Sequence, residues 1–418
     1  MDLSRLPFLP LEERDKYYDA ELRRMVNYAY ENAPSVKLKF DLASVKPSDI
    51  RSKKDLEKLP ITSKEDLMRS QAENPPFGGF LTKPAESFER IFVSPGPLYD
   101  VRDPKDGAFM TAFMFSTLGL TKGDRVINTF SYHLVPAGLI LDAGLRKAGC
   151  TVIPAGTGSS ELQLRIMRDL KVAGYAGTPS YLNILIKKAE ESGYDFRRDF
   201  QLRFAMFIGE KLSPSLRKNY EENYGLQVRE SYASGDVGVL GYECEKKSGM
   251  HMAEGAIIEI VDPTTLKQLG PGETGEVVVT PINETCPFIR FGTGDLSYYS
   301  DEPCACGRTA PRFIEIVGRV GEVIKIKGMF IYPSQVKNVM NKFPQVKKFQ
   351  LVVNRINEVD STTLQLEVED GVDKKIISDG IQKSFPEICT IRVNNLDFVA
   401  PGTISPEGKT IVDLREWK

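Results

Sequence analysis

Apolar residues at helical spacing mark the start of the chain. Leu22, Val26 and Tyr30 follow one another in steps of four, which places them on one face of a helix. A connector rich in Lys and Asp comes after this segment. The pattern predicts an N-terminal helical extension that packs against the rest of the protein.

From Leu139 onward, short apolar runs typical of strands alternate with amphipathic segments typical of helices. The strand-like runs are TVIPA, YAGTP, FAMFIG and LQVRESYA. Alternation of this kind predicts a parallel sheet whose strands are joined by helical crossovers. We therefore expect an α/β fold for this part of the chain.

The first crossover helix carries boundary signals at both ends. Ser160 begins a capping-box pattern, and Gly174 supplies a stop. Leu162, Ile166 and Leu170 share one face of this helix, which we expect to pack on the sheet.

A later crossover helix is bounded in a similar way. Ser213 is a suitable N-cap residue, and Pro214 is favoured at the first helical position because its missing N–H is not needed there. Gly225 ends the segment. The helix is therefore expected to begin just after the run FAMFIG.

Beyond Glu254 the pattern becomes rich in strands. The runs AIIEIV, GEVVVT and FIRF are separated by turns such as LGPGETG, and we expect them to form a separate sheet or a small barrel. After a boundary near Gly318, alternating strand and helix patterns recur, with helices expected from Pro333 and over 374–384 and a last strand in TIRVNN. The sequence thus predicts a large N-terminal domain, residues 1–318, and a small α+β domain, residues 319–418.

Composition narrows the function classes. The chain has 418 residues, of which 41% are hydrophobic and 27% charged, as in an ordinary globular enzyme. Its 55 basic residues nearly balance 57 acidic ones, so neither nucleic acid nor an anionic membrane is expected as a partner. The N-terminus lacks the pattern of a secretory signal, and six cysteines are too sparse for a disulfide scaffold. We expect a cytoplasmic protein.

Four residues have the chemistry of zinc ligands: Cys244, His251, Cys304 and Cys306. Three thiolates and one imidazole match a closed tetrahedral site, which would be structural because no position remains for water. The spacing is less diagnostic, since a single residue separates Cys304 from Cys306. Buried thiols and a surface histidine explain the same residues, so the sequence leaves both interpretations open.

A second set of residues is expected at strand ends. Gly209 and Glu210 follow the run AMFI, Tyr232 and Asp236 stand in ESYASGDVG, and Asp295 stands in RFGTGDL. The ends of parallel strands open onto one crevice, where nucleotides usually bind. Tyr232 can stack on a base, Asp236 can hold Mg²⁺ and Asp295 can accept the hydroxyls of a ribose. Taken alone, each of these residues is better explained as a turn or cap residue, and their order along the chain is what favours a nucleotide site.

A third signal lies near the C-terminus, where Lys409 follows a loop that contains Pro401 and Gly402. A lysine on such a loop can enter a closed site and neutralise charge that develops at phosphorus. An ordinary exposed lysine is the competing interpretation.

The order of these motifs along nearly the whole chain resembles the phenylacetate-coenzyme A ligase family of adenylate-forming enzymes. The matching segments are Arg90 and Ile91, SYHLVPAGL, TVIPAGTGSSELQLRIMRDL, GTPSYLNIL, GE at 209–210, Tyr232 with Asp236, the Cys and His set, FGTGDL, CACGRT, GR at 318–319 and EGK at 407–409.

The resemblance implies an enzyme that activates a carboxylic acid with ATP to an acyl adenylate and passes the acyl group to coenzyme A. Tyr232 would stack on adenine, Asp236 would replace the family's usual Glu as Mg²⁺ ligand, and Asp295 would bind ribose. Arg319 would support the nucleotide and Lys409 would serve adenylation. The resemblance also implies that Gly209 and Glu210 belong to the nucleotide site, that residues 1–318 bind AMP and the acid, and that residues 319–418 rotate between steps.

The resemblance further implies an acyl pocket near Tyr132, Ala155 and Gly156. An aromatic lining would suit phenylacetate or a related acid. A tyrosine beside a parallel sheet is, however, more often a core residue than a substrate wall. A homodimer is compatible with the sequence, which does not specify the oligomeric state.

The chain departs from the family at its phosphate loop, which is normally rich in Ser, Thr and Gly and ends in Lys. Here the loop contains Pro95 and Pro97, which lack an N–H, and Asp100, which brings a negative charge. Gly321 also stands where the family has an acidic hinge residue. Two alternatives follow: an adenylate-forming enzyme with another acceptor, or a catalytically silent homologue that binds a nucleotide or acyl-CoA.

Overall fold

The computed structural model describes residues 3–94, 97–102, 107–320, 324–327, 329–331, 333–356, 359–369, 371–405 and 408–415. Its chain contacts divide it into two compact units, Met1–Gly318 and Arg319–Lys418. The division falls at the residue where the sequence pattern places a domain boundary. Each unit has its own hydrophobic core and is described by itself.

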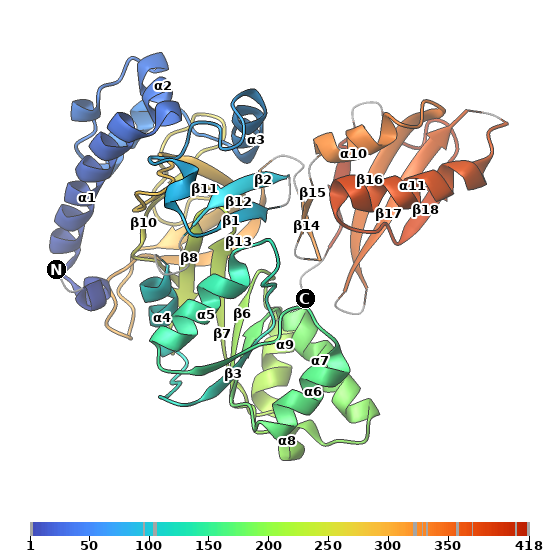
Figure 1. Cartoon of the computed structure of the whole chain (residues 1–418), viewed down its shortest axis with the longest axis horizontal. Helices are drawn as coiled ribbons and strands as arrows, with labels where there is room; N and C mark the ends of the chain where they lie inside the picture. Colours follow the sequence, from blue (N-terminus) through green and yellow to red (C-terminus); the bar gives the residue numbers. More distant parts are fainter. Residues whose placement is uncertain are drawn as a thin grey trace. The chain divides into compact units, whose positions relative to one another are not determined.

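The N-terminal segment is helical, as predicted. Its helices are α1 (Leu11–Asn32), α2 (Pro34–Leu42) and α3 (Lys64–Glu73), drawn in blue in Figure 1. Leu22 and Val26 are fully buried, and Tyr30 packs beside them. The same cluster includes Ile257 of a β-strand, so the helices are anchored on the large sheet of this unit.

Five parallel strands form one end of the large sheet of the first unit, in the order β4-β3-β5-β6-β7. Their bounds are β3 (Arg125–Asn128), β4 (Thr151–Pro154), β5 (Gly174–Gly177), β6 (Phe204–Ile208) and β7 (Gln227–Ser234). The accompanying helices are α4 (Ala108–Ser116), α5 (Ala137–Lys147), α6 (Ser160–Asp169), α7 (Pro179–Glu191), α8 (Phe196–Asp199) and α9 (Pro214–Lys218). The predicted parallel sheet with helical crossovers is confirmed.

The β-rich segment continues this sheet, so the prediction of a separate sheet or barrel was wrong. β8 (Gly238–Glu243) pairs antiparallel with β7, and the sheet extends through β9 (Met250–Met252), β13 (Arg312–Arg319), β12 (Phe291–Ser300), β11 (Gly275–Pro281) and β10 (Ala256–Val261). The result is an 11-stranded sheet. Local periodicity identified the strands but carried no information on which edge they would extend.

The predicted boundary of α9 is confirmed, whereas two predictions for α6 were wrong. Ser213 caps α9 with Pro214 at its first position, as predicted, and its hydroxyl accepts a hydrogen bond from the Leu216 N–H. In α6 the cap is Ser159 rather than Ser160. The expected buried face of α6 was also wrong.

Leu162 of α6 and its C-cap residue Leu170 are each almost half exposed, whereas Gln163, Leu164 and Met167 are buried. The side chain of Gln163 donates to the Gly156 carbonyl at 3.0 Å, which stabilises a polar residue on the inner face. The inner face of α6 therefore includes a polar side chain that is bonded to the loop just before the helix, and the most apolar stripe is partly exposed.

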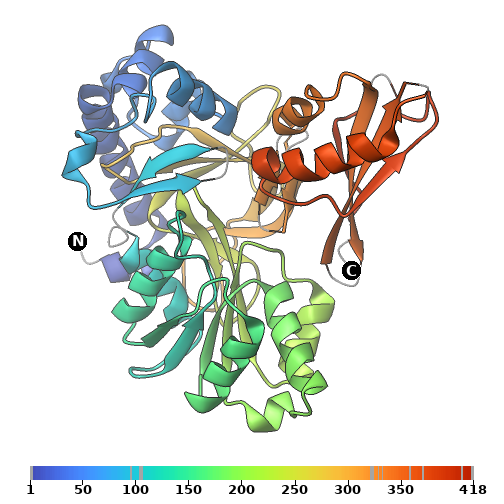
Figure 2. The ribbon, with the colours of Figure 1, turned by 45° about the vertical axis from the view of Figure 1, so that its right-hand side comes forward.

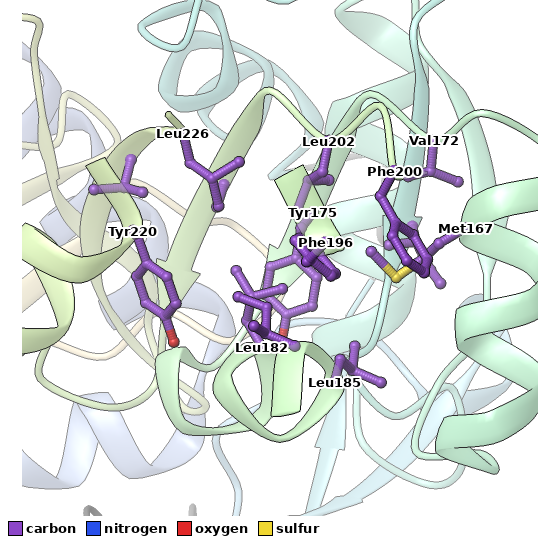
Figure 3. Packing of buried hydrophobic residues seen from close by; sticks show 14 of the residues in the cluster. Met167, Val172, Tyr175, Leu182, Leu185, Phe196, Phe200, Leu202, Tyr220 and Leu226 are labelled. Carbon is purple, nitrogen blue, oxygen red and sulfur yellow. The ribbon is translucent and has the colours of Figure 1, made fainter. Parts of the chain in front are cut away.

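The core between the parallel sheet and helices α6 to α9 combines aliphatic side chains with five buried aromatic ones, Tyr175, Phe196, Phe200, Phe207 and Tyr220. Figure 3 shows Tyr175 of β5 surrounded by residues of these helices, among them Leu182 and Phe196. Phe196 and Phe200 stack with ring centroids 4.7 Å apart. This packed layer fixes the strand ends that carry the site residues.

The second unit is a small α+β domain (Figure 2, orange and red). Its four-stranded sheet has the order β18-β17-β16-β19, with β16 (Val346–Ile356), β17 (Val359–Val368), β18 (Asn395–Phe398) and β19 (Ile411–Asp413). Helices α10 (Pro333–Met340) and α11 (Lys374–Cys389) share one core with this sheet, and β14 (Ile324–Ile326) pairs with β15 (Met329–Ile331). The last predicted strand, TIRVNN, was placed too early, because β18 begins at Asn395.

Candidate functional site

Tyr232 and Asp295 meet although they come from strands that are not neighbours in the sheet. The Tyr232 hydroxyl donates to Asp295 Oδ2 at 2.8 Å and lies 3.3 Å from Thr293 Oγ1. Three strands separate β7 from β12 in the sheet order, so the sheet must curve for these side chains to touch. The Tyr232 ring also packs edge-on against Phe313, with ring centroids 5.6 Å apart.

The loop of Asp295 is internally fixed. Thr293 Oγ1 accepts a hydrogen bond of 3.1 Å from the Asp295 N–H, while its own hydroxyl donates to the Val277 carbonyl. Asp295 lies within β12, not at a strand end as the sequence suggested. It reaches the carboxyl end of β7 because antiparallel strands fold back beside the parallel ones.

Asp236 lies in the turn between β7 and β8, four residues after Tyr232. Its Oδ2 is 3.1 Å from Nζ of Lys64, at the first position of α3, and Ser234 Oγ lies 3.4 Å from the same oxygen. The Arg102 guanidinium donates to the Asp236 backbone carbonyl. The predicted metal ligand therefore has two protein cations beside it.

The described part of the divergent phosphate loop forms a hairpin of β1 (Ile91–Ser94) and β2 (Leu98–Val101). Pro95 and Gly96 lie outside the described residues, and Pro97 is an exposed turn residue. Asp100 forms an ion pair of 2.6 Å with Arg102. Burial raises the pKa of Asp100 above its ordinary value, and the Asp236 carboxylate adds to this, although Arg102 acts in the opposite direction.

Gly209 and Glu210 directly follow β6, as predicted. Gly209 has a φ of +89°, a conformation that residues with a Cβ rarely adopt. Oε2 of Glu210 accepts a hydrogen bond of 3.3 Å from the Ser180 N–H at the start of α7. These residues join the ends of β5 and β6.

The proposed acyl-pocket residues partly come together. An added Cβ on Gly156 would lie 3.9 Å from Cδ2 of Tyr132, so these two residues are adjacent, and Ala155 packs on the neighbouring aromatic core. The Tyr132 hydroxyl accepts from Asn128 Nδ2 at 2.8 Å and lies 3.4 Å from Asp142 Oδ2. Burial, aided by the Asp142 carboxylate, raises the pKa of Tyr132, which stays a neutral phenol.

A cavity of about 450 Å³ opens beside the Asp236 turn, but Tyr132, Ala155 and Gly156 do not line it. Its apolar walls come from Phe88, Met110, Ile140, Val237, Val239, Pro281 and Ile282. Its polar and small lining residues are Arg24, Thr82, Lys83, Arg102, Gly107, Thr111, Gly238, Gly255, Asn283, Glu284 and Thr285. The cavity is large enough for a small organic acid.

The four predicted metal ligands form one cluster. The ligand atoms of Cys244, His251, Cys304 and Cys306 all lie within 4.8 Å of one another. Nε2 of His251 is 3.3 Å from Cys306 Sγ, and Nδ1 of His251 is 3.1 Å from the Ala310 carbonyl. A backbone carbonyl on Nδ1 is the usual partner of a histidine that binds metal through Nε2.

Arg319 and Lys409 belong to the second unit. Arg319 is the last residue of β13, and Lys409 has an exposed side chain just before β19, where its carbonyl accepts from Gln350 Nε2 at 2.8 Å. Gly321 and Glu407, both named in the sequence analysis, lie outside the described residues.

Sequence reasoning missed Lys64, Arg102 and Thr293. Lys64 stands 172 positions before Asp236, in a segment whose only readable signal is the capping box of Ser63 and Asp66. Arg102 follows the divergent loop without a motif of its own. Thr293 was also missed, although it stands within the FGTGDL segment, and that motif is the signal that could have found it.

Two family models match the chain. The model described as AMP-binding enzyme covers residues 107–282, and the model described as AMP-binding enzyme C-terminal domain covers residues 328–415. Among the described residues, no helix combines the length and the apolar character needed to cross a lipid bilayer.

Individual relatives match most of the chain. A phenylacetate-coenzyme A ligase from Thermus thermophilus is 30% identical over 93% of this chain and 89% of its own length. One from Escherichia coli is 31% identical over 86% of this chain and 84% of its own. A crystal structure of 2-hydroxyisobutyryl-CoA ligase with 2-HIB-AMP and CoA superposes with a TM-score of 0.92 at 26% identity, covering 99% of this chain and 92% of that one.

Proposed function

Because the chain belongs to the phenylacetate-coenzyme A ligase family of adenylate-forming enzymes, we propose that it activates a carboxylic acid with ATP and transfers the acyl group to coenzyme A. The observation that carries this proposal is the hydrogen bond between Tyr232 of β7 and Asp295 of β12, and Asp236 follows Tyr232 by four residues in the turn after β7. An aromatic ring, a ribose-binding carboxylate and a metal-binding carboxylate are thus available around one nucleotide.

In the first step, an oxygen of the acid attacks the α-phosphorus of ATP, the bond to the bridging oxygen breaks and pyrophosphate leaves. Tyr232 stacks on adenine, Asp295 accepts the ribose hydroxyls, and Gly209 and Glu210 complete the nucleotide site. In the second step, the sulfur of coenzyme A attacks the acyl carbonyl and AMP leaves. Arg319 supports the nucleotide, and Lys409 stabilises charge during adenylation.

Asp236 is a suitable single protein ligand for Mg²⁺. The hydrogen bonds from Lys64 and Ser234 both fall on Oδ2, so Oδ1 is the oxygen that would hold the ion. Mg²⁺ is usually bound by one or two carboxylates together with the phosphates of its substrate. When bound, the ion would neutralise charge on the phosphate oxygens.

We propose phenylacetate or a related aromatic acid as the substrate, as in the curated relatives. Tyr132, Ala155 and Gly156 are the first candidate for the acyl site. The 450 Å³ cavity is the second candidate, because Val237 and Gly238, which line it, follow Asp236 directly. Replacing Ile140 by Trp would fill that cavity, whereas Tyr132→Ala would alter the first site. The variant that raises the KM for the acid identifies the acyl site.

We also propose that the Cys and His cluster binds a structural Zn²⁺. Four protein ligands leave no position for a reacting water, so the ion would join the β8–β9 segment to the segment before β13. A cytoplasmic location stays a prediction from the sequence, and a homodimer stays compatible with it.

The alternatives differ in their products. An enzyme with another acceptor would release pyrophosphate but would not form an acyl-CoA, whereas a silent homologue would do neither. The decisive test measures acid-dependent pyrophosphate release over a panel of aromatic and branched acids, followed by the mass of the product with coenzyme A. If no acid of the panel stimulates pyrophosphate release by folded protein supplied with Mg²⁺ and Zn²⁺, the proposed function is contradicted.

A further inference from the structure

Lys64 lies where the divergent phosphate loop meets the Asp236 turn. Its ammonium is 3.1 Å from Asp236 Oδ2, and the side chains of Lys64 and Asp236 are 13% and 9% exposed. This is a sheltered ion pair and not one of the solvent-exposed surface pairs, which contribute little to stability. We therefore ask what function a sheltered lysine has beside the residue that is expected to bind the metal.

The helix that carries Lys64 is joined to the loop hairpin. Gln71 of α3 donates from Nε2 to the Tyr99 carbonyl at 2.7 Å, and its Oε1 accepts from the Tyr99 N–H at 2.9 Å. A small cavity of about 20 Å³ is lined by α3 residues together with Ser94, Asp100 and Asp236. Lys64, the loop hairpin and the Asp236 turn are therefore held as one assembly.

The described residues of this assembly include charged groups of both signs. Asp100 and Asp236 supply two carboxylates, while Arg102 and Lys64 supply two cations. Arg102 is engaged with the Asp100 carboxylate at 2.6 Å and with the Asp236 carbonyl. Asp100 thus lowers the positive charge that the loop offers in two ways. It stands where the family has a cation, and its carboxylate forms an ion pair with Arg102.

An ammonium group has three donors, so the contact with Asp236 does not by itself prevent a contact with a phosphate oxygen. Resting on the proposed function, we propose that Lys64 binds the pyrophosphate portion of ATP and replaces the cation that the phosphate loop lacks. Its contact with Oδ2 also orients Asp236 and leaves Oδ1 as the atom that would hold Mg²⁺. The adenosine portion is held separately by Tyr232 and Asp295.

The test compares nucleotide binding by calorimetry in wild type, Lys64→Ala, Lys64→Arg and Lys54→Ala. Lys54 is a matched control, because it is 71% exposed and pairs only at the surface with Glu57 among its described ion pairs. Each protein is titrated with ATP and with AMP, in Mg²⁺ and again in EDTA, so that binding is read without turnover.

We expect Lys64→Ala to weaken ATP binding about tenfold or more, in EDTA as well as in Mg²⁺, because a charge-assisted contact is lost. Its AMP affinity should stay within about twofold of wild type, Lys64→Arg should retain most of the ATP affinity, and Lys54→Ala should retain all of it. Retained AMP binding also shows that the variant is folded.

Two results would overturn the inference while the proposed function stands: unchanged ATP affinity in Lys64→Ala, or an equal loss of ATP and AMP affinity, which would indicate a merely structural role. Wild-type protein that binds no ATP in either condition would overturn both the inference and the proposed function.

Discussion

The Tyr232 hydroxyl donates a 2.8 Å hydrogen bond to the Asp295 carboxylate across 63 positions of the sequence. Because β7 and β12 are not adjacent in the sheet, only the curvature of the antiparallel half brings these groups together. The contact holds the carboxylate toward the ring that is proposed to stack on adenine. It therefore prepares the ribose and base subsites as one unit.

Removing the Asp295 carboxylate should weaken AMP binding. Asp295→Asn is expected to lower AMP affinity about tenfold or more, since hydrogen bonds to a charged acceptor are among the stronger ones. Tyr232→Phe keeps the ring and should have a smaller effect. The control is Tyr299→Phe on the same strand, whose hydroxyl contacts the Leu269 carbonyl instead. Calorimetric titration with AMP measures all three; equal affinities throughout would contradict the assignment.

Lys409 should matter for one of the two steps only. Lys409→Ala is expected to slow acid-dependent pyrophosphate release about a hundredfold or more, because charge at phosphorus loses its stabilisation. Formation of acyl-CoA from added acyl adenylate should stay within a few-fold of wild type. Lys383→Ala, an exposed lysine of α11 in the same unit, serves as control. An equal loss in both steps would argue against a role specific to adenylation.

The zinc proposal predicts a metal content and a stability change. Wild-type protein should contain one zinc per chain, and Cys304→Ala should contain none and melt about 10 °C lower or more, because a structural zinc site contributes folding free energy. Cys389→Ala, a buried thiol of the second unit, should keep the zinc. Elemental analysis and a melting curve decide this, and a metal-free wild type would reject the site.

The raised pKa of Glu230 predicts that the free energy of unfolding depends on pH. Burial, together with the neighbouring Glu243 carboxylate, raises its pKa from the ordinary 4.5 to about 7, with Arg217 and Lys211 acting against this. Between these values the folded protein binds more protons than the unfolded chain, so the free energy of unfolding falls as pH rises through this window.

Glu230→Gln removes this titration. The stability of the variant relative to wild type should therefore rise by about 2 kcal/mol between about pH 5 and about pH 8. Denaturant unfolding at the two pH values measures the difference. Glu222→Gln at the surface should show no such trend, and a trend of opposite sign for Glu230→Gln would refute the assignment.

Much of the fold was readable because its signals are local. The capping of α9 by Ser213, the buried stripe of Leu22 and Val26, and the parallel strands all depend on neighbouring residues. The merging of the β-rich segment into the 11-stranded sheet was not readable, because strand partners far apart in sequence decide it. The face of α6 was misread for a different reason, since apolar spacing alone did not show that polar Gln163 would turn inward and bond to the Gly156 carbonyl just before the helix.

Some residues of the candidate site could be identified from the sequence, and others could not. Residue types alone singled out the Cys and His set, Tyr232, Asp236 and Asp295, and the structure brings the metal-ligand set together and Tyr232 together with Asp295. Lys64 could not be singled out, because nothing in its own segment indicates a carboxylate 172 positions away. Charge compensation of this kind becomes visible only when distant segments are placed side by side.

The most direct test of the account is a single-turnover experiment without coenzyme A. The enzyme is mixed with ATP, Mg²⁺ and the best acid of the panel, quenched and analysed by mass spectrometry. The account predicts a bound acyl adenylate that accumulates to about one per active chain and is converted to acyl-CoA and AMP when coenzyme A is added. Formation of acyl-CoA with no detectable acyl adenylate, or no reaction of any panel acid with ATP, would contradict it.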